Sequence, residues 1–205
     1  MLSFSKDKEW SIDYPWFSSK VAGGRVMDTG FIEHNFFTKE LCDRGFSVYG
    51  VDLDEWDYRW VSDNFNYVKT ELCEELPFSN EFFDCIVSPS LIEHLGLGHY
   101  GDIIIDEGDS LAVGEFYRVL KPSGVLLVQI PFGSVSRIIL NGIGKPFYKT
   151  YTDRRIRRLF SKFTIKSKSY AIKNGWWEPA NEDEAMKMDY CSGLTPCIVR
   201  LEAVK

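Results

Sequence analysis

Residues 25–54, which read RVMDTGFIEHNFFTKELCDRGFSVYGVDLD, decide the fold of this chain. The apolar residues 26–27 predict a strand that stops at the turn 28–30. Apolar residues at helical spacing across 36–41 then predict a helix, which Gly45 ends because glycine accepts the left-handed conformation of a C-cap. A second strand follows over residues 48–51, so the stretch predicts a strand, a tight turn, a helix and a strand.

Asp52 stands at the carboxyl end of this second predicted strand. In open α/β sheets ligands bind at the carboxyl ends of the strands, where an acid can accept hydrogen bonds from both hydroxyls of a ribose. The stretch therefore predicts a site for a cofactor that contains a nucleoside. The turn before the helix holds one glycine, Gly30, where such sites usually hold two or three.

The composition is that of a soluble globular protein, with 205 residues of which 44% are hydrophobic and 26% charged. The start, MLSFSKDKEW, lacks the apolar stretch of a secretory signal, and no apolar run is long enough to span a bilayer. We therefore expect a cytoplasmic protein with no membrane partner. The five cysteines form no CxxC pair, so reduced, mostly buried thiols are expected rather than a metal site.

The net charge of −6 is unevenly distributed along the chain. Residues 1–110 hold 8 Lys and Arg against 22 Asp and Glu, whereas residues 111–205 hold 16 against 8. The acidic half argues against a nucleic-acid partner. The basic half contains an arginine-rich run at 154–158, which is either the solvated face of an amphipathic helix or a contact for an anionic substrate.

Strands and helices alternate through residue 131, which predicts a mostly parallel sheet covered by helices on both faces. Further strands are expected at 65–69, 82–87 and 125–131, helices at 110–120 and 153–160, and closing strands at 163–170 and 197–203. No helix is evident between the last two strands, so one antiparallel strand is expected at the sheet edge. We expect a single domain over 1–205, with a cap segment at 1–22, a cofactor-binding core at 24–132 and a closing part at 133–205.

Four sequence blocks occur in a particular order: RVMDTG, VYGVDLD, ELPFSNEFFDCIVS followed by SLIEHLG, and EFYRVLKPSGVLLVQIPF. In this order they resemble the class I S-adenosylmethionine-dependent methyltransferases, in particular the small-molecule enzymes of quinone biosynthesis. The resemblance covers residues 24–132. It implies an α/β, Rossmann-like methyltransferase fold: a three-layer sandwich with a mostly parallel seven-stranded sheet and one antiparallel edge strand. It also implies S-adenosyl-L-methionine as the cofactor.

The resemblance further implies which residues bind that cofactor. They are, in chain order, Asp28, Thr29, Gly30, Asp52, Leu53, Glu71, Leu72, Ser88 and Ser90. The first three form the loop that approaches the methionine part, and Asp52 binds the ribose. Glu71 is the nearest acid to the position that meets the adenine amino group, in a register that the sequence leaves open.

The first loop departs from the family pattern, which places glycines at alternate positions. Here those positions hold Gly30, Ile32 and His34. Glycine allows a positive φ and a close backbone approach to a ligand, whereas the β-branched Ile32 favours neither. Either the loop binds the cofactor in a wider geometry, or the chain is a non-catalytic methyltransferase-like domain that binds a partner or ligand. Nicotinamide binding is disfavoured because GxGxxG is absent.

Methyl transfer needs a nucleophile held in line with the methyl carbon, and a hydroxyl nucleophile also benefits from a base. The candidates are Glu93, His94 and His99 in the stretch SLIEHLGLGHYGD, which follows the fourth strand. Glu93 and His94 could instead fix the loop by hydrogen bonds, and His99 could be an exposed loop histidine. A metal site formed by these residues and Asp102 would rest on a weakly restrictive pattern.

The sequence thus predicts methyl transfer to O or N of a small molecule, with an anionic or saccharide acceptor, such as a nucleotide-sugar, as one candidate. An RNA or protein methyltransferase is a less favoured alternative. The fourth strand is followed by Ser88-Pro89-Ser90-Leu91, not by an Asn/Asp-Pro-Pro-Tyr tetrapeptide. Aromatic residues at 14–17 and 176–177 could stack on a sugar or flat ring, or plug the core. The oligomeric state is not specified by the sequence.

Overall fold

The computed structural model describes residues 8–31, 35–55, 62–188 and 196–205 of the chain. Within these residues the centre of the molecule is an eight-stranded sheet in the order β3-β2-β1-β4-β5-β10-β8-β9. Its strands are β1 (Arg25–Thr29), β2 (Ser47–Asp52), β3 (Phe65–Lys69), β4 (Phe83–Pro89), β5 (Leu120–Pro131), β8 (Thr164–Asn174), β9 (Trp176–Ala180) and β10 (Cys197–Val204).

The sheet is mostly parallel, as the sequence predicts. Strands β3, β2, β1, β4 and β5 run parallel to their neighbours, whereas β10 runs antiparallel to both β5 and β8. The predicted fold class is confirmed, but the described sheet has eight strands rather than seven, because β9 pairs antiparallel with β8. The antiparallel β10 also lies inside the sheet rather than at its edge, because the chain leaves β8 through β9 before it returns.

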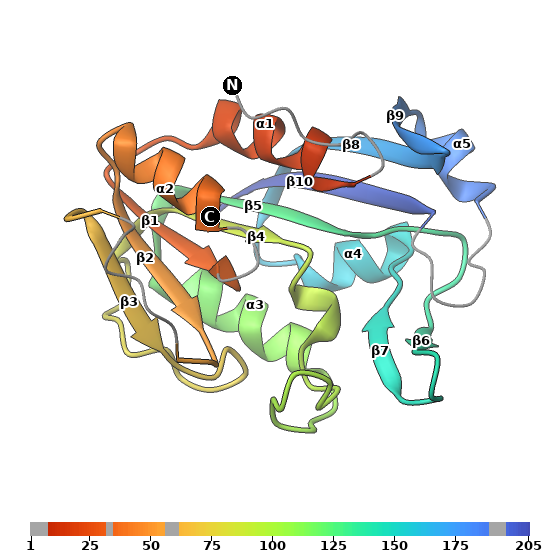
Figure 1. Cartoon of the computed structure of the whole chain (residues 1–205), viewed down its shortest axis with the longest axis horizontal. Coiled ribbons are helices and arrows are strands. Elements are labelled where there is room, and N and C mark those ends of the chain that lie inside the picture. The colour runs from red at the N-terminus through yellow and green to blue at the C-terminus, as the bar shows by residue number, and fades with distance from the viewer. Residues whose placement is uncertain (1–7, 32–34, 56–61, 189–195) are drawn as a thin grey trace.

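Helices cover both faces of the sheet and complete a three-layer sandwich (Figure 1). The helices α1 (Trp10–Lys20) and α2 (Asn35–Asp43) lie on one face, and α3 (Gly108–Val119) and α4 (Asp153–Leu159) lie on the other. Thr152 caps α4 by accepting a hydrogen bond from the Arg155 N–H, as its residue type favours. A short helix, α5 (Glu182–Met186), packs beside β8.

The apolar run in β5 shows why the sheet needs cover on both faces. Leu126, Val128 and Ile130 belong to the core beneath α3, whereas Leu127 belongs to the core beneath α1 and α2. Successive side chains of a strand point to opposite faces, so a continuous apolar run buries both. All four of these side chains have no exposed surface.

A small hairpin, β6 (Ile138–Leu140) and β7 (Pro146–Lys149), follows β5 and lies outside the main sheet (Figure 1). We do not predict this hairpin from the sequence. The signal was present, because Asn-Gly at 141–142 after an apolar run is typical of a hairpin turn. The Asn141 side-chain oxygen accepts hydrogen bonds from the backbone N–H groups of Ile143 and Lys145, which fixes the turn.

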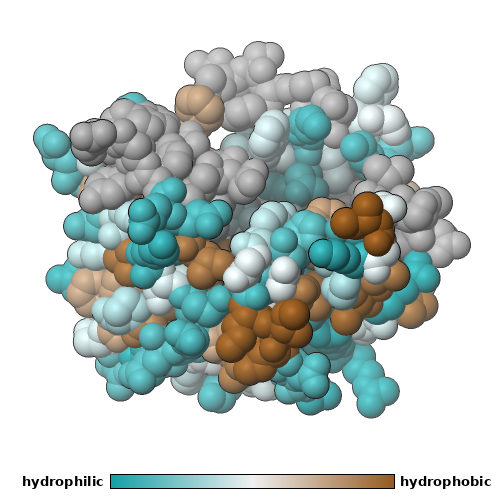
Figure 2. Space-filling view, turned by 60° about the horizontal axis from the view of Figure 1, so that its bottom comes forward, coloured by the Kyte–Doolittle hydropathy of each residue, from teal (hydrophilic) through white to brown (hydrophobic). Residues whose placement is uncertain are grey.

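The surface carries several exposed apolar side chains, seen as brown patches in Figure 2. Two of the most exposed are Ile104, in the loop between β4 and α3, and Ile143, in the β6–β7 turn. No helix among the described residues is long and apolar enough to cross a membrane. Four cysteines, Cys42, Cys73, Cys85 and Cys197, are free and buried, and Cys191 lies outside the described residues.

Candidate active site

A cavity of about 430 Å³ opens at the carboxyl ends of the parallel strands. Parallel strands bring their carboxyl ends to one edge of a sheet, which is where open α/β sheets bind ligands. Its lining includes the residues that follow or end β1 to β5, together with α1, the loop after β4 and the hairpin. The lining residues are Glu9, Trp10, Asp13, Tyr14, Gly30, Asp52, Leu53, Asp54, Thr70, Glu71, Leu72, Pro89, Ser90, Leu91, Glu93, His94, Leu95, Tyr100, Asp102, Gln129, Pro131, Phe147 and Tyr148.

The turn after β1 reaches the cavity through Gly30. This glycine has φ of +65°, in the left-handed region, and a Cβ built on it would lie 3.1 Å from the Leu91 side chain. Its N–H donates to the Val51 carbonyl at 2.9 Å, which ties the turn to β2. A glycine is therefore required at this position both for its backbone conformation and for space.

Asp28 and Thr29 lie behind this turn rather than in the cavity lining. Asp28 is fully buried and accepts a hydrogen bond of 2.7 Å from the Thr38 hydroxyl, so it links β1 to α2. The Thr29 hydroxyl donates to the Val87 carbonyl of β4. Both residues shape the loop from beneath. Ile32 and His34, on which the predicted departure of this loop depends, lie outside the described residues.

One end of the cavity, which we call the cofactor end, is defined by Gly30, Asp52, Leu53, Glu71 and Leu72. The Asp52 Oδ1 accepts hydrogen bonds from the backbone N–H groups of Leu53, at 2.8 Å, and Asp54. The Glu71 carboxylate accepts the N–H groups of Cys73 and Ile103, both at 3.2 Å. Each carboxylate therefore already has donors from the backbone, and Glu71 also holds the loop after β4.

Asp102 organises that loop, which covers residues 96–107. Its Oδ2 accepts the N–H groups of Gly96 and Gly98, and its Oδ1 accepts that of Tyr100, at 3.0 to 3.1 Å. Gly96 has φ of +79°, and a Cβ there would lie 2.3 Å from the Ile105 carbonyl oxygen. The loop thus has one compact conformation that only glycine at 96 permits.

Another part of the lining, which we call the acceptor end, is defined by Glu9, Asp13, Glu93, His94 and Gln129. The 3-10 turn η2 (Ile92–His94) places Glu93 directly after β4. Ser90, whose φ is +50°, donates its hydroxyl proton to Glu93 Oε1 at 2.8 Å. Glu93 is 1% exposed, and its Oε2 makes no hydrogen bond. Burial raises the pKa of Glu93 to about 8, and the neighbouring Glu9 adds to this.

His94 is held in one tautomer. Its Nδ1 lies 2.7 Å from the Phe147 carbonyl oxygen of β7, and a carbonyl only accepts, so Nδ1 carries the proton and Nε2 is the acceptor atom. Burial lowers the pKa of His94 to about 4, although the bond to Phe147 opposes this. His94 is therefore neutral at physiological pH, and it is a weak base.

Glu9, Asp13 and Gln129 at the acceptor end are absent from the sequence-based prediction. Glu9 and Asp13 come from the start of α1, and Gln129 comes from β5. Asp13 is 2% exposed and its Oδ1 makes no hydrogen bond; its nearest described cation is the Arg200 guanidinium, at 3.8 Å. Burial, then Glu9, raises the pKa of Asp13 well above its usual value. An acid on a cap helix gives no signal by itself.

His99 and Ser88 do not line the cavity. The ring of His99 packs on those of Phe147, Tyr100 and His94, with centroids 4.5 to 6.3 Å apart, which supports the hairpin from outside. Ser88 is fully buried in β4. Among the described residues no group of three or more His, Cys, Asp or Glu side chains is arranged to hold a metal ion. Asp102 and His94 are instead held by backbone groups.

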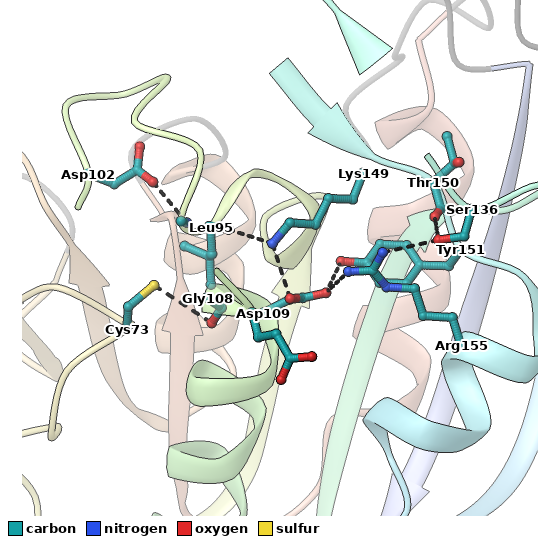
Figure 3. Close-up of polar contacts among 12 residues, drawn as sticks. Cys73, Leu95, Asp102, Gly108, Asp109, Ser136, Lys149, Thr150, Tyr151 and Arg155 are labelled. Atoms are coloured by element: carbon teal, nitrogen blue, oxygen red, sulfur yellow. Dashed lines mark hydrogen bonds and ion pairs between the residues drawn. The ribbon is translucent and has the colours of Figure 1, made fainter. Parts of the chain in front are cut away.

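A buried ionic network holds the hairpin against the loop after β4 (Figure 3). Asp109, in the first turn of α3, accepts hydrogen bonds from Arg155 at 2.8 Å, the Tyr151 hydroxyl at 3.0 Å and Lys149 at 3.1 Å. Lys149 also donates to the Leu95 carbonyl at 2.7 Å. Lys149 is adjacent to Phe147 and Tyr148, so the network sets the position of the hairpin wall of the cavity.

The arginine-rich run at 154–158 does not reach the cavity lining. Arg155 belongs to the Asp109 network, Arg157 pairs with Asp153 and Arg158 pairs with Glu107. These three guanidinium groups are therefore already paired with carboxylates, either within the fold or on its surface. The described lining contains no Lys or Arg at all, and it contains seven Asp and Glu.

Part of the chain matches known proteins in sequence. A family model described as "Methyltransferase domain" matches residues 32–128. The ubiquinone/menaquinone biosynthesis C-methyltransferase UbiE of Pectobacterium atrosepticum is 36% identical over 88 residues, which are 43% of this chain and 30% of that protein. The chain thus spans under a third of the length of this curated relative.

Solved structures share the fold along most of the chain. A SAM-dependent methyltransferase of Methanosarcina mazei has a TM-score of 0.63 at 15% identity and covers 94% of this chain and 97% of its own. A 1,6-didemethyltoxoflavin-N1-methyltransferase of Burkholderia thailandensis, solved with its substrate and S-adenosylhomocysteine, has a TM-score of 0.62 at 17% identity, covering 88% and 70%. Residues 32–128 thus match a methyltransferase domain in sequence, and the fold is like that of solved S-adenosylmethionine-dependent methyltransferases, as the resemblance implies.

The residues at the cofactor end fit S-adenosylmethionine. The Asp52 carboxylate lines the cavity at the end of β2, where ribose hydroxyls can donate to it, and Gly30 keeps the neighbouring turn free of a side chain. An acidic lining without Lys or Arg also suits a cofactor that carries a sulfonium cation. Asp52, Leu53, Glu71 and Leu72 would hold the nucleoside, as the sequence predicts.

Proposed function

We propose that this protein transfers a methyl group from S-adenosylmethionine to an O or N atom of a small molecule. The observation that carries the proposal is one cavity with Gly30 and Asp52 at one end and Glu93 and His94 at the other. A cofactor and a nucleophile can therefore be held in a single enclosed space, which is what an in-line displacement requires.

The cofactor supplies an electrophilic methyl carbon bonded to a sulfonium. The protein then has to hold the nucleophile and to take its proton. Glu93, with a pKa of about 8, is the better match to this task near neutral pH, because a base works best when its pKa lies near the operating pH. His94, with a pKa of about 4, is the weaker base and instead orients the acceptor through Nε2.

Calorimetric titration with S-adenosylmethionine and S-adenosylhomocysteine tests the cofactor half of the proposal. We expect binding that Asp52→Ala weakens by about 10- to 100-fold, because hydrogen bonds to a charged group contribute about 1.5–3 kcal/mol. The control is Asp63→Asn, an exposed acid before β3, which should leave the affinity unchanged. No binding of either ligand to the wild type would favour the alternative of a non-catalytic domain.

Activity of the wild type against a panel of small acceptors tests the second half. Glu93→Gln should lower kcat by about 100-fold or more if Glu93 is the base, since general bases typically contribute that much. His94→Ala should raise KM more than it lowers kcat, because it removes an orienting contact. A larger loss of kcat in His94→Ala than in Glu93→Gln would reverse the two roles.

C-methylation of a hydroquinone-type ring is a second candidate. The curated relative named above is a C-methyltransferase of ubiquinone and menaquinone biosynthesis, and the acceptor end has aromatic walls formed by Trp10, Tyr14 and Tyr148. The matched family region, 32–128, includes neither α1 nor the hairpin, so these walls belong to this chain rather than to the match. With a hydroquinone and an aromatic amine as substrates, the position of the new methyl group, on ring carbon or on oxygen or nitrogen, separates the two candidates.

A further inference from the structure

The distribution of charge in the cavity points to the kind of acceptor it binds. Seven Asp and Glu line it, and the described lining holds no Lys or Arg. His94 adds no positive charge, because burial lowers its pKa to about 4. An anionic ligand would find no counter-charge here, whereas a cationic one would find several.

The seven acids differ in how they are stabilised. Asp52, Glu71 and Asp102 each accept two or more backbone N–H groups, so their charges are stabilised by the fold. Glu93 accepts its own backbone N–H and the Ser90 hydroxyl, yet Glu93 and Asp13 each keep one oxygen without a hydrogen bond. These two acids, together with Glu9, all come from the acceptor end.

Buried oxygens without partners are costly, and the fold does little to offset them here. Glu93 and Asp13 are 1% and 2% exposed, and Glu9 repels both electrostatically. The nearest described cation to Asp13 is Arg200 at 3.8 Å, beyond hydrogen-bond distance, and Arg200 itself donates to the Ile12 carbonyl. Gln129, also 1% exposed, has an Nε2 without a partner at the same end. Three independent side chains therefore have hydrogen-bonding capacity that nothing described in the protein uses.

The walls around these groups are apolar and aromatic. Trp10 and Tyr14 of α1 face the cavity from one side, and Tyr100, Phe147 and Tyr148 line it from the loop and the hairpin. Aromatic rings bury flat apolar groups and attract cations through their faces. A cation on an aromatic body would thus meet both features of this end.

We propose that the acceptor end binds a protonated amine carried by an aromatic body, with Asp13 and Glu93 as the counter-ions and Gln129 as a donor to a neighbouring ligand oxygen. This inference rests on the proposed function in that it names the class of acceptor at the same site. It replaces the anionic acceptor suggested by the arginine-rich run, whose guanidinium groups are used elsewhere.

A matched set of ligands tests the inference: phenethylamine, 2-phenylethanol, 3-phenylpropionate and ethylamine. Each is titrated calorimetrically into the protein at neutral pH, with and without saturating S-adenosylhomocysteine. We expect phenethylamine to bind at least about tenfold more tightly than 2-phenylethanol, since bonds to charged groups are stronger than neutral ones. We expect no binding of 3-phenylpropionate, and weaker binding of ethylamine because it lacks the ring.

Variants locate the binding. Asp13→Asn and Glu93→Gln should each weaken phenethylamine by about tenfold or more and leave 2-phenylethanol and S-adenosylhomocysteine within about threefold. Glu74→Gln, an exposed acid outside the cavity, is the matched control and should change nothing. Circular dichroism and thermal melting confirm that each variant is folded.

The release of a proton on ligand binding gives a further measurement. A purely structural role of Glu93 would not produce it. An ammonium beside Glu93 favours its ionised form, so binding should release a proton and the enthalpy should depend on the ionisation enthalpy of the buffer. Glu93→Gln should abolish that dependence. Two observations would each overturn the inference: equal binding of the amine and the alcohol, or no amine binding while S-adenosylhomocysteine binds. Amine binding without S-adenosylhomocysteine binding would instead refute the proposed methyl transfer and leave the amine site standing.

Discussion

The two ends of the cavity hold carboxyl groups in opposite circumstances. At the cofactor end, Asp52 and Glu71 accept hydrogen bonds from backbone N–H groups of adjoining loops. At the acceptor end, Asp13 and Glu93 are buried with unbonded oxygens and raised pKa values. The first arrangement fixes the backbone and stabilises charge in the absence of ligand. The second leaves two buried carboxyl groups whose charge a bound ligand can stabilise.

The comparison is tested most strongly through Asp109, whose network positions the hairpin that holds His94. Asp109→Asn leaves Lys149, which is 5% exposed, without its carboxylate, and breaking one partner of a buried pair typically costs about 3–5 kcal/mol. We expect a loss of that size in chemical denaturation, with the affinity for S-adenosylhomocysteine of the folded variant within about threefold of wild type.

Asp153→Asn is the matched control, because Asp153 also stands in the first turn of a helix and pairs with basic side chains, but is partly exposed. Its removal should cost about 1 kcal/mol or less. An equal loss of stability in the two variants would show that the buried Asp109 network stabilises the fold no more than a partly exposed pair does.

A substitution at Gly30 tests the cofactor end. Gly30→Val places a β-branched side chain at φ of +65°, which costs about 1–2 kcal/mol, and also crowds Leu91. We expect the affinity for S-adenosylhomocysteine to fall by about tenfold or more, because the shifted turn lies beside Asp52. Gly114→Val, at a half-buried helix position where a Cβ meets nothing within 4 Å, is the control. Unchanged binding in Gly30→Val would show that this turn does not approach the cofactor.

The pH dependence of stability gives a smaller effect, which comes from the carboxyl groups of the acceptor end. Glu93 titrates at about 8 when folded and has an ordinary pKa of 4.5, so the folded state holds its proton where the unfolded state has lost it. His94, at about 4 against an ordinary 6.5, acts in the opposite sense, but only below pH 6.5. Between pH 6.5 and 8 stability should therefore fall with rising pH, by at most about 1.4 kcal/mol per pH unit from Glu93.

Urea denaturation across this pH range measures the slope. Asp13 and Glu9, whose pKa values are also raised, add to the fall. Glu93→Gln should reduce the slope, and Glu74→Gln should not, because Glu74 is exposed. A slope that Glu93→Gln leaves unchanged would mean that Glu93 is ionised in the folded protein.

Much of the fold could be predicted because its signals are local. The strand β3 has the predicted bounds, 65–69, and β1, α2 and β2 follow the order expected from the opening stretch. The hairpin β6–β7 and strand β9 escaped prediction. Their segments are short, and their pairing depends on partners rather than on a repeated apolar pattern.

The candidate site divides in the same way. Gly30, Asp52, Glu93 and His94 could be placed because each follows a strand end, and strand ends converge in a parallel sheet. Glu9 and Asp13 could not, because only the packing of α1 over the sheet brings them to Glu93. Asp28, Thr29 and Ser88 were expected at the cofactor, yet they lie behind the lining, because their side chains bond inward or are fully buried.

The sequence by itself determined the fold class and the cofactor end, because the turn, the helix and the acid at 52 lie within thirty consecutive residues and need few long-range contacts. Only the tertiary structure decided the acceptor end. Its acids lie about eighty residues apart in the chain, and their charge and protonation depend on burial that no local pattern reveals. The choice of cofactor is thus visible in the sequence, whereas the choice of acceptor is a property of the folded cavity.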